Sequence, residues 1–266
     1  MQYEIRAMGL GEILDQGIQL TKNHFALFFK VTLYALIPVS LAFGMYLEYL
    51  VQDETRILEN LGAIQVAGGL NALVTLLFVL PVTYIGLAYV IAEVYLGRSI
   101  TAGDAFHRGL SCIVPVIIAS ILYYLIVMIG IVLLIIPGII FGIWFGLYYL
   151  VIAIENKTGI EALKRSKALV STAFLTLFVL GFVVGIISFC IQLISGFVPV
   201  PYVGTIIGSV GGAIVIIFAV SCSVVYYFSC RCRLENFDLE LLAESMGVTL
   251  EDDGDSDDDD LDNPFA

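Results

Sequence analysis

Side chains able to carry out acid–base, nucleophilic or metal chemistry are scarce in this sequence and form no familiar motif. The two histidines, His24 and His107, stand apart, and the sequence has no HExxH, GxSxG or GxxxxGK[ST] motif. Cys230 and Cys232 are too close together for half of a usual zinc site, and no second Cys/His cluster exists. The acidic run at 252–260 lacks the glycine and terminal glutamate of an EF-hand loop in register. We expect no catalytic residue, metal site or cofactor.

The segments that would have to position any such side chains are strongly apolar. Of the 266 residues, 60% are hydrophobic and 14% are charged, whereas soluble domains carry roughly 25% charged residues. The mean hydropathy is +1.00. A soluble globule of this size has too little interior to hide so many apolar side chains. The composition excludes an ordinary soluble enzyme and predicts an all-α integral membrane protein.

The formal charge of −12 is concentrated near the carboxyl end. Residues 251–262 hold nine of the 24 acidic residues, so the rest of the chain is nearly neutral. Such a chain has no general attraction for nucleic acid, whose phosphates require a basic surface. We expect two parts: a membrane domain over 1–242 and a disordered acidic cytoplasmic tail over 243–266, because like charges repel and the tail has no apolar face.

Long uncharged runs predict six transmembrane helices, since a helix needs about 20 apolar residues to cross a bilayer. The expected spans are 31–47, 60–92, 113–135, 138–154, 173–195 and 204–229. Pro81 predicts a kink in the second span. The spans pair into three hairpins, and the second hairpin turns near Pro137 while the third turns at 198–201. A re-entrant hairpin at Pro137 is the main alternative to a tight external turn there.

The basic residues set the expected orientation. With six spans, eleven of the twelve Lys and Arg residues fall on the side of the amino terminus, and only Arg56 falls on the other side. The positive-inside rule therefore predicts that both termini lie in the cytoplasm. Asn60 and Val200 should lie outside, and Lys164 and Asp255 inside.

A similar short segment precedes each expected hairpin. The three segments are Gly11–Leu20, Gly103–Cys112 and Ile160–Leu169. Each has an acidic residue, an apolar residue two positions later and a small residue three positions after that. Thr101 with Asp104, and Thr158 with Glu161, have the spacing of a capping box, which starts a helix. We predict three short cytoplasmic amphipathic helices. Internal duplication is the favoured origin; the alternative is that any interfacial helix shows this pattern.

Two spans carry glycines at every fourth position. These residues are Gly138, Gly142 and Gly146 in the fourth span, and Gly204, Gly208 and Gly212 in the sixth. Small residues four apart allow helices to approach closely. We expect them to pack helices within the bundle, with a homodimer as the alternative.

Basic side chains gather at two expected cytoplasmic ends. They are Lys164, Arg165, Lys167, Arg231 and Arg233. Each such side chain near an anionic membrane surface contributes about 1 kcal/mol of attraction, so these five are candidate contacts for lipid headgroups. The alternative is that they only enforce topology.

Three stretches resemble a known membrane domain. They are 9–17, then 136–138 with 153–156 and 161–166, and finally 226–240. Together they resemble the membrane domain fused to some bacterial glycerophosphoryl diester phosphodiesterases, which also occurs alone. Members tend to have an acidic residue at the position of Phe228 or Ser229 and a basic one at Leu234. The resemblance implies a stand-alone domain of the bacterial inner membrane without phosphodiesterase activity, because a separate barrel of about 250 residues carries that chemistry.

The function expected from these observations is non-catalytic. Span centres without ionisable groups are not typical of an intramembrane enzyme or an ion-coupled transporter. We expect a membrane protein that scaffolds partners or engages lipid at the cytoplasmic face, with a second membrane protein or a second copy as its partner. The alternative is a permease or flippase-like transporter, which a polar cavity lined by Asn71, Thr83 and Gln192 would favour.

Overall fold

The computed structural model describes residues 3–51, 54–198, 200 and 202–239, and within them the chain is helical, without strands. The expected tail at 243–266 lies outside the described residues. In chain order the helices are α1 Leu10–Ala35, α2 Ile37–Val51, α3 Glu54–Val74, the π-helical turn η1 Thr75–Val79, α4 Leu80–Tyr95, α5 Ala102–Ser111, α6 Ile113–Leu133, α7 Ile135–Phe145, α8 Tyr148–Glu155, α9 Gly159–Ser171, α10 Phe174–Phe197 and α11 Val203–Glu235.

Several of these helices are long and apolar enough to cross a membrane. Five such stretches occur among the described residues: Gly68–Tyr95, Ile113–Leu133, Ile135–Glu155, Phe174–Phe197 and Val203–Glu235. The bent pair formed by α1 and α2, which meet at 50°, adds a sixth if it is counted as one span. The prediction of an all-helical protein with several membrane-spanning segments is confirmed to this extent.

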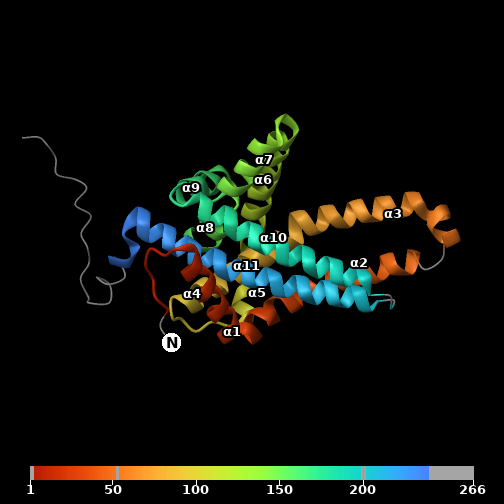
Figure 1. Ribbon diagram of the computed structural model, residues 1–266, viewed down its shortest axis with the longest axis horizontal. Helices are drawn as coiled ribbons and strands as arrows, with labels where there is room; N and C mark the ends of the chain where they lie inside the picture. Colours follow the sequence, from red (N-terminus) through yellow and green to blue (C-terminus); the bar gives the residue numbers. More distant parts are fainter. Residues whose placement is uncertain (1–2, 52–53, 199, 201, 240–266) are drawn as a thin grey trace, which may run out of the picture.

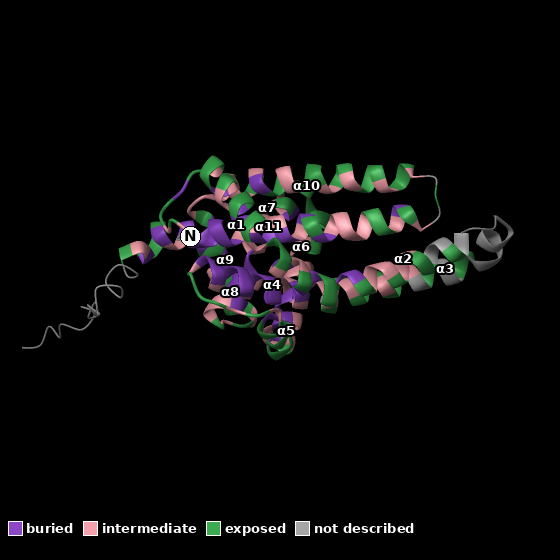
Figure 2. Cartoon of the chain, turned by 90° about the horizontal axis from the view of Figure 1, so that it is seen from below, coloured by how far each residue is buried: buried purple, intermediate pink, exposed green. Residues whose placement is uncertain are grey.

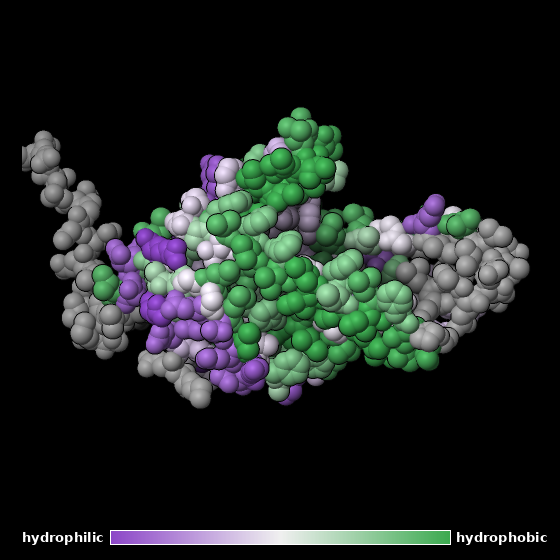
Figure 3. Space-filling model, in the orientation of Figure 1, coloured by the Kyte–Doolittle hydropathy of each residue, from purple (hydrophilic) through white to green (hydrophobic). Residues whose placement is uncertain are grey.

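The helices form one packed region from which pairs of helices extend. In Figure 1, α10 and the adjoining part of α11 run toward one side, as do α2 and α3, whereas α6 and α7 extend in a different direction. Buried residues concentrate where α1, α4, α8, α9 and α11 meet (Figure 2). On the face seen in Figure 3, hydrophilic residues gather at that end and apolar residues cover the helix pairs. We call the region formed by α5, α8, α9 and the adjoining parts of α1, α4 and α11 the packed end.

Close approach of α1 and α11 builds the core of the packed end. A Cβ atom placed on Gly17 would lie 2.4 Å from the Sγ of Cys222 and 3.2 Å from its Cα, so only glycine fits there without a shift. Nearby, the backbone N–H of Met8 donates to the buried hydroxyl of Ser229 at 2.8 Å. These contacts fix the start of α1 against the carboxyl-terminal half of α11.

The first repeated segment differs from the expectation of a separate short helix. Residues Gly11–Leu20 are the beginning of the 26-residue α1, which continues past an irregular residue at His24. The second and third segments do form helices of their own, α5 and α9. The capping box predicted at Thr101 and Asp104 is formed. The N–H of Asp104 donates to the hydroxyl of Thr101, and the N–H of Thr101 donates to the carboxylate of Asp104. Thr158 begins α9 without a capping hydrogen bond from its side chain.

Pro81 lies two residues after a π-helical turn. The N–H of Leu80 donates to the carbonyl of Thr75, five residues back, and Thr83 donates its hydroxyl to the carbonyl of Val79 at 2.6 Å. Proline has no N–H to donate, so the local change of register and the threonine hydroxyl accommodate it within a continuous helix. The sequence predicted a kink at Pro81, whereas the structure has a π turn before it within one continuous helix.

The turn near Pro137 is shorter than expected. Leu134 alone is extended, with φ −161° and ψ 138°, and α7 begins at the next residue. Pro137 therefore lies in the first turn of α7, where a missing N–H costs little because helix termini leave those donors unpaired.

Candidate functional site

Ionised side chains meet at the packed end, where α8, α9 and α11 join. Arg165 of α9 pairs with Glu155 of α8 at 2.9 Å and also with Glu235 of α11. The carboxylate of Glu155 also accepts a hydrogen bond from the hydroxyl of Tyr227 at 2.7 Å and forms an ion pair with Lys157 at 2.9 Å. The side chains of Glu155 and Arg165 are only 12% and 16% exposed. A charge removed from water to this degree is stable only with partners, and here each charge has several.

The charge of Arg165 is favoured by these partners. Burial lowers the pKa of its guanidinium, but hydrogen bonds to Glu155 and Glu235 outweigh burial and raise the pKa above its ordinary value. The cluster therefore acts as an ionic joint between three helices.

The five basic residues expected to contact lipid headgroups fall into two groups. Arg165 and Arg231 both pair with Glu235, and Arg231 also covers the ring of Phe237 at 4.0 Å. Arg233 donates to the backbone carbonyl of Met8. All three guanidinium groups have contacts within the chain, but Arg233 is exposed, whereas Arg165 and Arg231 are half-buried.

Lys164 and Lys167 are exposed on α9. The Nζ of Lys167 lies 4.6 Å from the centre of the Trp144 ring. Of the five candidates, these two keep ammonium groups that are accessible to a headgroup.

An interruption that the sequence did not reveal separates α7 from α8. The fourth expected span was continuous over 138–154, but the helix breaks at Gly146 and Leu147. Ser166 of α9 bridges the break: its hydroxyl donates to the carbonyl of Trp144 at 2.9 Å and accepts from the N–H of Leu147 at 3.1 Å. A side chain that inserts into the helical hydrogen-bond ladder is a known cause of such a break. In the sequence, Ser166 was noticeable only as the small residue of the third repeat.

The glycines of the fourth span do not form one seam. A Cβ on Gly138 would lie 2.7 Å from the backbone nitrogen of Ile131 in α6, which is closer than real Cβ contacts. A Cβ on Gly142 would meet only the hydroxyl oxygen of Tyr123, at 3.8 Å, and one on Gly146 would meet the carbonyl of Gly142 in its own chain segment. Only Gly138 brings two helices together.

The sixth span has its close contacts near the start of α11. A Cβ on Gly204 or Gly208 would lie within 2.8 Å of an oxygen of Ser195 in α10, whereas a Cβ on Gly212 would meet nothing within 4 Å. Gly211 instead lies against Ile191, at 2.7 Å. The glycine that contacts α10 after Gly208 is thus Gly211 and not Gly212. The row of glycines at every fourth position does not stay aligned with α10.

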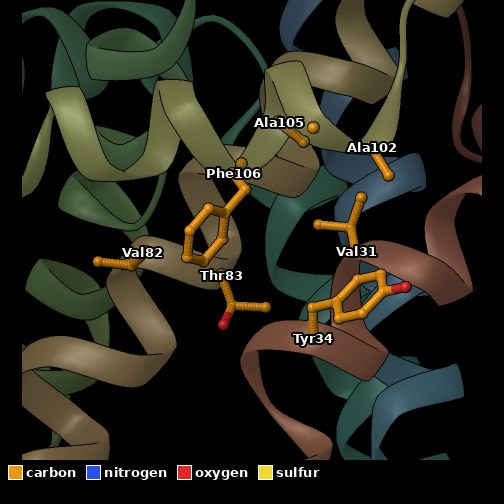
Figure 4. Close-up of a pocket in the computed structure, with 9 residues that line it drawn as sticks. Val31, Tyr34, Val82, Thr83, Ala102, Ala105 and Phe106 are labelled. Atoms are coloured by element: carbon orange, nitrogen blue, oxygen red, sulfur yellow. The ribbon is translucent and has the colours of Figure 1, made fainter.

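An apolar cavity of about 370 Å³ opens between α1, α4 and α5. Figure 4 shows side chains from the three helices converging on it: Val31 and Tyr34 of α1, Val82 and Thr83 of α4, and Ala102, Ala105 and Phe106 of α5. Gly86 and Gly103 complete the lining. Since the hydroxyl of Thr83 donates to its own helix, the walls offer few polar groups.

The three polar residues expected to line a transporter cavity do not come together in this apolar cavity, nor in a second cavity between α4, α5 and α8. Thr83 lines the apolar cavity, but Asn71 lies in α3 and Gln192 lies in α10, and neither contributes to that lining. The residues of α5 that make the cavity were not singled out from the sequence. Gly103 and Phe106 belong to the second repeat, but a repeat pattern does not predict a cavity.

Comparison of the chain with family models, with curated proteins and with solved structures found no match. The resemblance to the phosphodiesterase-associated membrane domain therefore stays a prediction. Four residues within the resembling stretches, Glu155, Arg165, Arg231 and Glu235, are members of the ionic joint.

Proposed function

We propose that this chain is a non-catalytic membrane protein that binds lipid and holds an acyl chain in the apolar cavity between α1, α4 and α5. The cavity carries this proposal. Its volume of about 370 Å³ lies within the roughly 300–1,000 Å³ of ordinary ligand sites. Hydrocarbon is the ligand that suits walls of valine, alanine, glycine and aromatic rings.

The rim of the cavity supports a lipid that enters from its surroundings. Tyr34 is 71% exposed and Phe106 is 50% exposed, so the opening lies at the surface. Of the helices around it, α4 belongs to a stretch that is apolar enough to cross a bilayer and α1 belongs to the bent pair, whereas α5 is a short helix of mixed polarity. An opening there meets lipid tails, which fill apolar space that water would leave empty. The exposed Lys164 and Lys167 add attraction for an anionic headgroup at the packed end.

Orientation and location belong to the same proposal. We infer from the distribution of basic residues that the packed end faces the cytoplasm, in the inner membrane of a bacterium. The predicted homodimer or membrane-protein partner also remains a proposal.

A transporter is the second candidate, and two interruptions favour it. The break between α7 and α8 and the π turn before Pro81 are irregularities of the kind that line transport pathways. The apolar character of the cavity gives the lipid-binding proposal more support.

Filling the cavity tests the proposal. Gly103 lines the cavity, and a Cβ there would meet only the Thr101 hydroxyl at 3.6 Å, so Gly103→Phe occupies the space without a backbone clash. The purified chain is irradiated with a phosphatidylcholine that carries a diazirine in one acyl chain, and crosslinked peptides are identified by mass spectrometry. We expect labelling of peptides covering 82–106 in the wild type and a several-fold loss in the variant.

Gly11→Phe is the matched control. Gly11 is also the second residue of its helix, and a Cβ there meets nothing within 4 Å. This variant should label like the wild type. Unchanged labelling of 82–106 in Gly103→Phe, with helicity retained in circular dichroism, would contradict the proposal.

A further inference from the structure

A second cavity, of about 260 Å³, opens where α4, α5 and the end of α8 meet. It shares no lining residue with the apolar cavity. Its walls carry both a guanidinium, Arg108, and a carboxylate, Glu93, together with the aromatic ring of Tyr89 and the amide of Asn156. This combination is a recognition surface with both signs of charge.

Hydrogen bonds hold the guanidinium of Arg108 in place, but they do not use all of its donors. Its Nη2 donates to the carbonyl of Ala153 at 2.9 Å and to the Oδ1 of Asn156. Its Nε is buried and has no hydrogen-bond partner. The guanidinium also lies 5.4 Å from the centre of the Tyr89 ring. With both hydrogens of Nη2 used and Nε buried, Nη1 is the nitrogen left to donate to a ligand in the cavity, and the fixed positive charge attracts phosphate oxygens.

Asn156 positions the guanidinium through the conformation of its own backbone. It ends α8 in the left-handed region, with φ 58°, which asparagine tolerates better than most residues. The carboxyl end of α8 thus supplies one backbone and one side-chain oxygen, and together they orient Arg108.

Glu93 is the complementary group on the other wall. Its side chain is 18% exposed and pairs with Arg98 at 3.2 Å, but the side chain of Arg98 is 64% exposed. An ion pair with so exposed a partner contributes little. Glu93 can therefore exchange Arg98 for a cationic group within the cavity at small cost.

We propose that this cavity binds a zwitterionic headgroup, with a phosphate against Arg108 and a primary ammonium against Glu93. An anion alone would be repelled by Glu93, and a cation alone by Arg108. Phosphoethanolamine carries both charges two carbons apart, and its ammonium hydrogens can be donated to a carboxylate. The source is either an ethanolamine phospholipid or a soluble phosphoethanolamine, which share this chemistry.

Native mass spectrometry of the full chain in detergent tests the site by counting bound lipid. Phosphatidylethanolamine, phosphatidylglycerol and phosphatidylcholine with identical acyl chains are titrated separately. We expect the wild type to prefer phosphatidylethanolamine, because glycerol lacks the ammonium and choline cannot donate a hydrogen bond. Glu93→Gln and Arg108→Gln should each weaken its binding about tenfold, as loss of a charge-assisted hydrogen bond does.

Arg98→Gln is the matched control, since it removes the other partner of Glu93 and should leave binding unchanged or stronger. Arg108 also anchors α8, so Glu93→Gln keeps the test decisive if Arg108→Gln does not fold. Equal binding of the three lipids by the wild type, or unchanged phosphatidylethanolamine binding in Glu93→Gln, would overturn the proposal. Added phosphoethanolamine separates the sources: displacement of the lipid at similar concentration assigns the site to the soluble compound, and no displacement assigns it to the lipid. Either result supports the headgroup chemistry.

Discussion

The amino-terminal half of α11 is the more apolar in sequence, yet the carboxyl-terminal half, which ends in charged residues, is the buried one. In the carboxyl-terminal half, the side chains from Val224 to Cys230 are buried against other helices of the packed end. In the amino-terminal half, Val203, Ile206 and Ile207 are exposed, although α10 lies alongside (Figure 1) and Gly44 of α2 lies against Thr205. The same contrast separates the packed end from α6 and α7, where Leu133 and Ile136 are 72% exposed.

This contrast has a physical reason. A side chain that faces lipid is as well solvated as one that faces protein, so hydrophobicity does not determine which half of a span packs. Hydrogen bonds, ion pairs and close backbone contacts do so instead. At the packed end, Ser229, Tyr227 and Glu155 have partners on other helices. Stability should therefore depend most on a few polar and small residues at the packed end, and it should be insensitive to substitution of the exposed side chains on the other helices.

The ionic joint should give the largest effect. Glu155→Ala leaves Arg165 and Tyr227 without their shared partner, and breaking a buried ion pair costs about 3–5 kcal/mol. We expect a loss at the low end of this range, because Glu235 still pairs with Arg165. The free energy of unfolding is measured by SDS titration in mixed micelles, followed by circular dichroism.

Arg6→Gln is the control for this prediction. It removes ion pairs to Glu4 and Glu12 whose side chains are at least 48% exposed, so its effect should be much smaller than that of Glu155→Ala. If Glu155→Ala and Arg6→Gln lowered the free energy of unfolding equally, burial of the ionic joint would not be what determines its contribution to stability.

Overpacking at the α1–α11 contact should come next. Gly17→Ala places a methyl group against Cys222 and should destabilise the protein by about 1–3 kcal/mol. Gly181→Ala in α10 meets nothing within 4 Å and should be neutral or slightly stabilising, because alanine favours helix. Both are measured by the same titration.

A double variant locates the cause of this loss. Cys222→Ala removes the sulfur nearest to the new methyl group, so it should recover part of the stability lost in Gly17→Ala. A Gly17→Ala protein as stable as the wild type would show that α1 and α11 do not approach as closely as the structure has them.

A smaller effect should distinguish two glycines of one ladder. Gly138→Ala brings its methyl group within 3 Å of the Ile131 backbone in α6, whereas Gly142→Ala has room beside Tyr123. We expect a loss of about 1–2 kcal/mol for Gly138→Ala and none for Gly142→Ala. If Gly142→Ala is the more damaging substitution, an oligomer interface outside the single chain becomes the better explanation of the ladder.

How far the sequence predicted these features depended on their physical origin. Uncharged length determines whether a helix can cross a membrane, so five of the spans were predictable, and the sixth is a bent pair of helices. Pro81 predicted a kink because it lacks a donor, and the structure has a π turn before it. The partners of Arg165 and Ser166 were not predictable, since they join helices distant in sequence. The repeated glycines predicted close helix packing but not which of them would contact a neighbouring helix, because the position of the contact depends on how the two helices cross. Neither cavity has a signature in a single segment.

The smallest predicted effect on stability concerns the first residues of two helices in the packed end, α5 and α9. Thr101 caps α5 by accepting from the N–H of Asp104, whereas Thr158 begins α9 without such a bond. Loss of a threonine cap costs about 1 kcal/mol, so Thr101→Ala should destabilise the protein by that amount and Thr158→Ala by much less. Both are compared with the wild type at neutral pH.

The pH dependence of this difference tests its cause. Hydrogen bonds from the hydroxyl and then the N–H of Thr101 lower the pKa of Asp104. A carboxyl whose pKa is lower in the folded state stabilises that state above its unfolded pKa, and this contribution is lost as the pH falls through the folded pKa. The difference between wild type and Thr101→Ala should therefore shrink in acid, while the effect of Thr158→Ala stays constant. A difference independent of pH would mean that Thr101 stabilises α5 only by accepting from the N–H of Asp104, without the hydrogen bond that its hydroxyl donates to the Asp104 carboxylate.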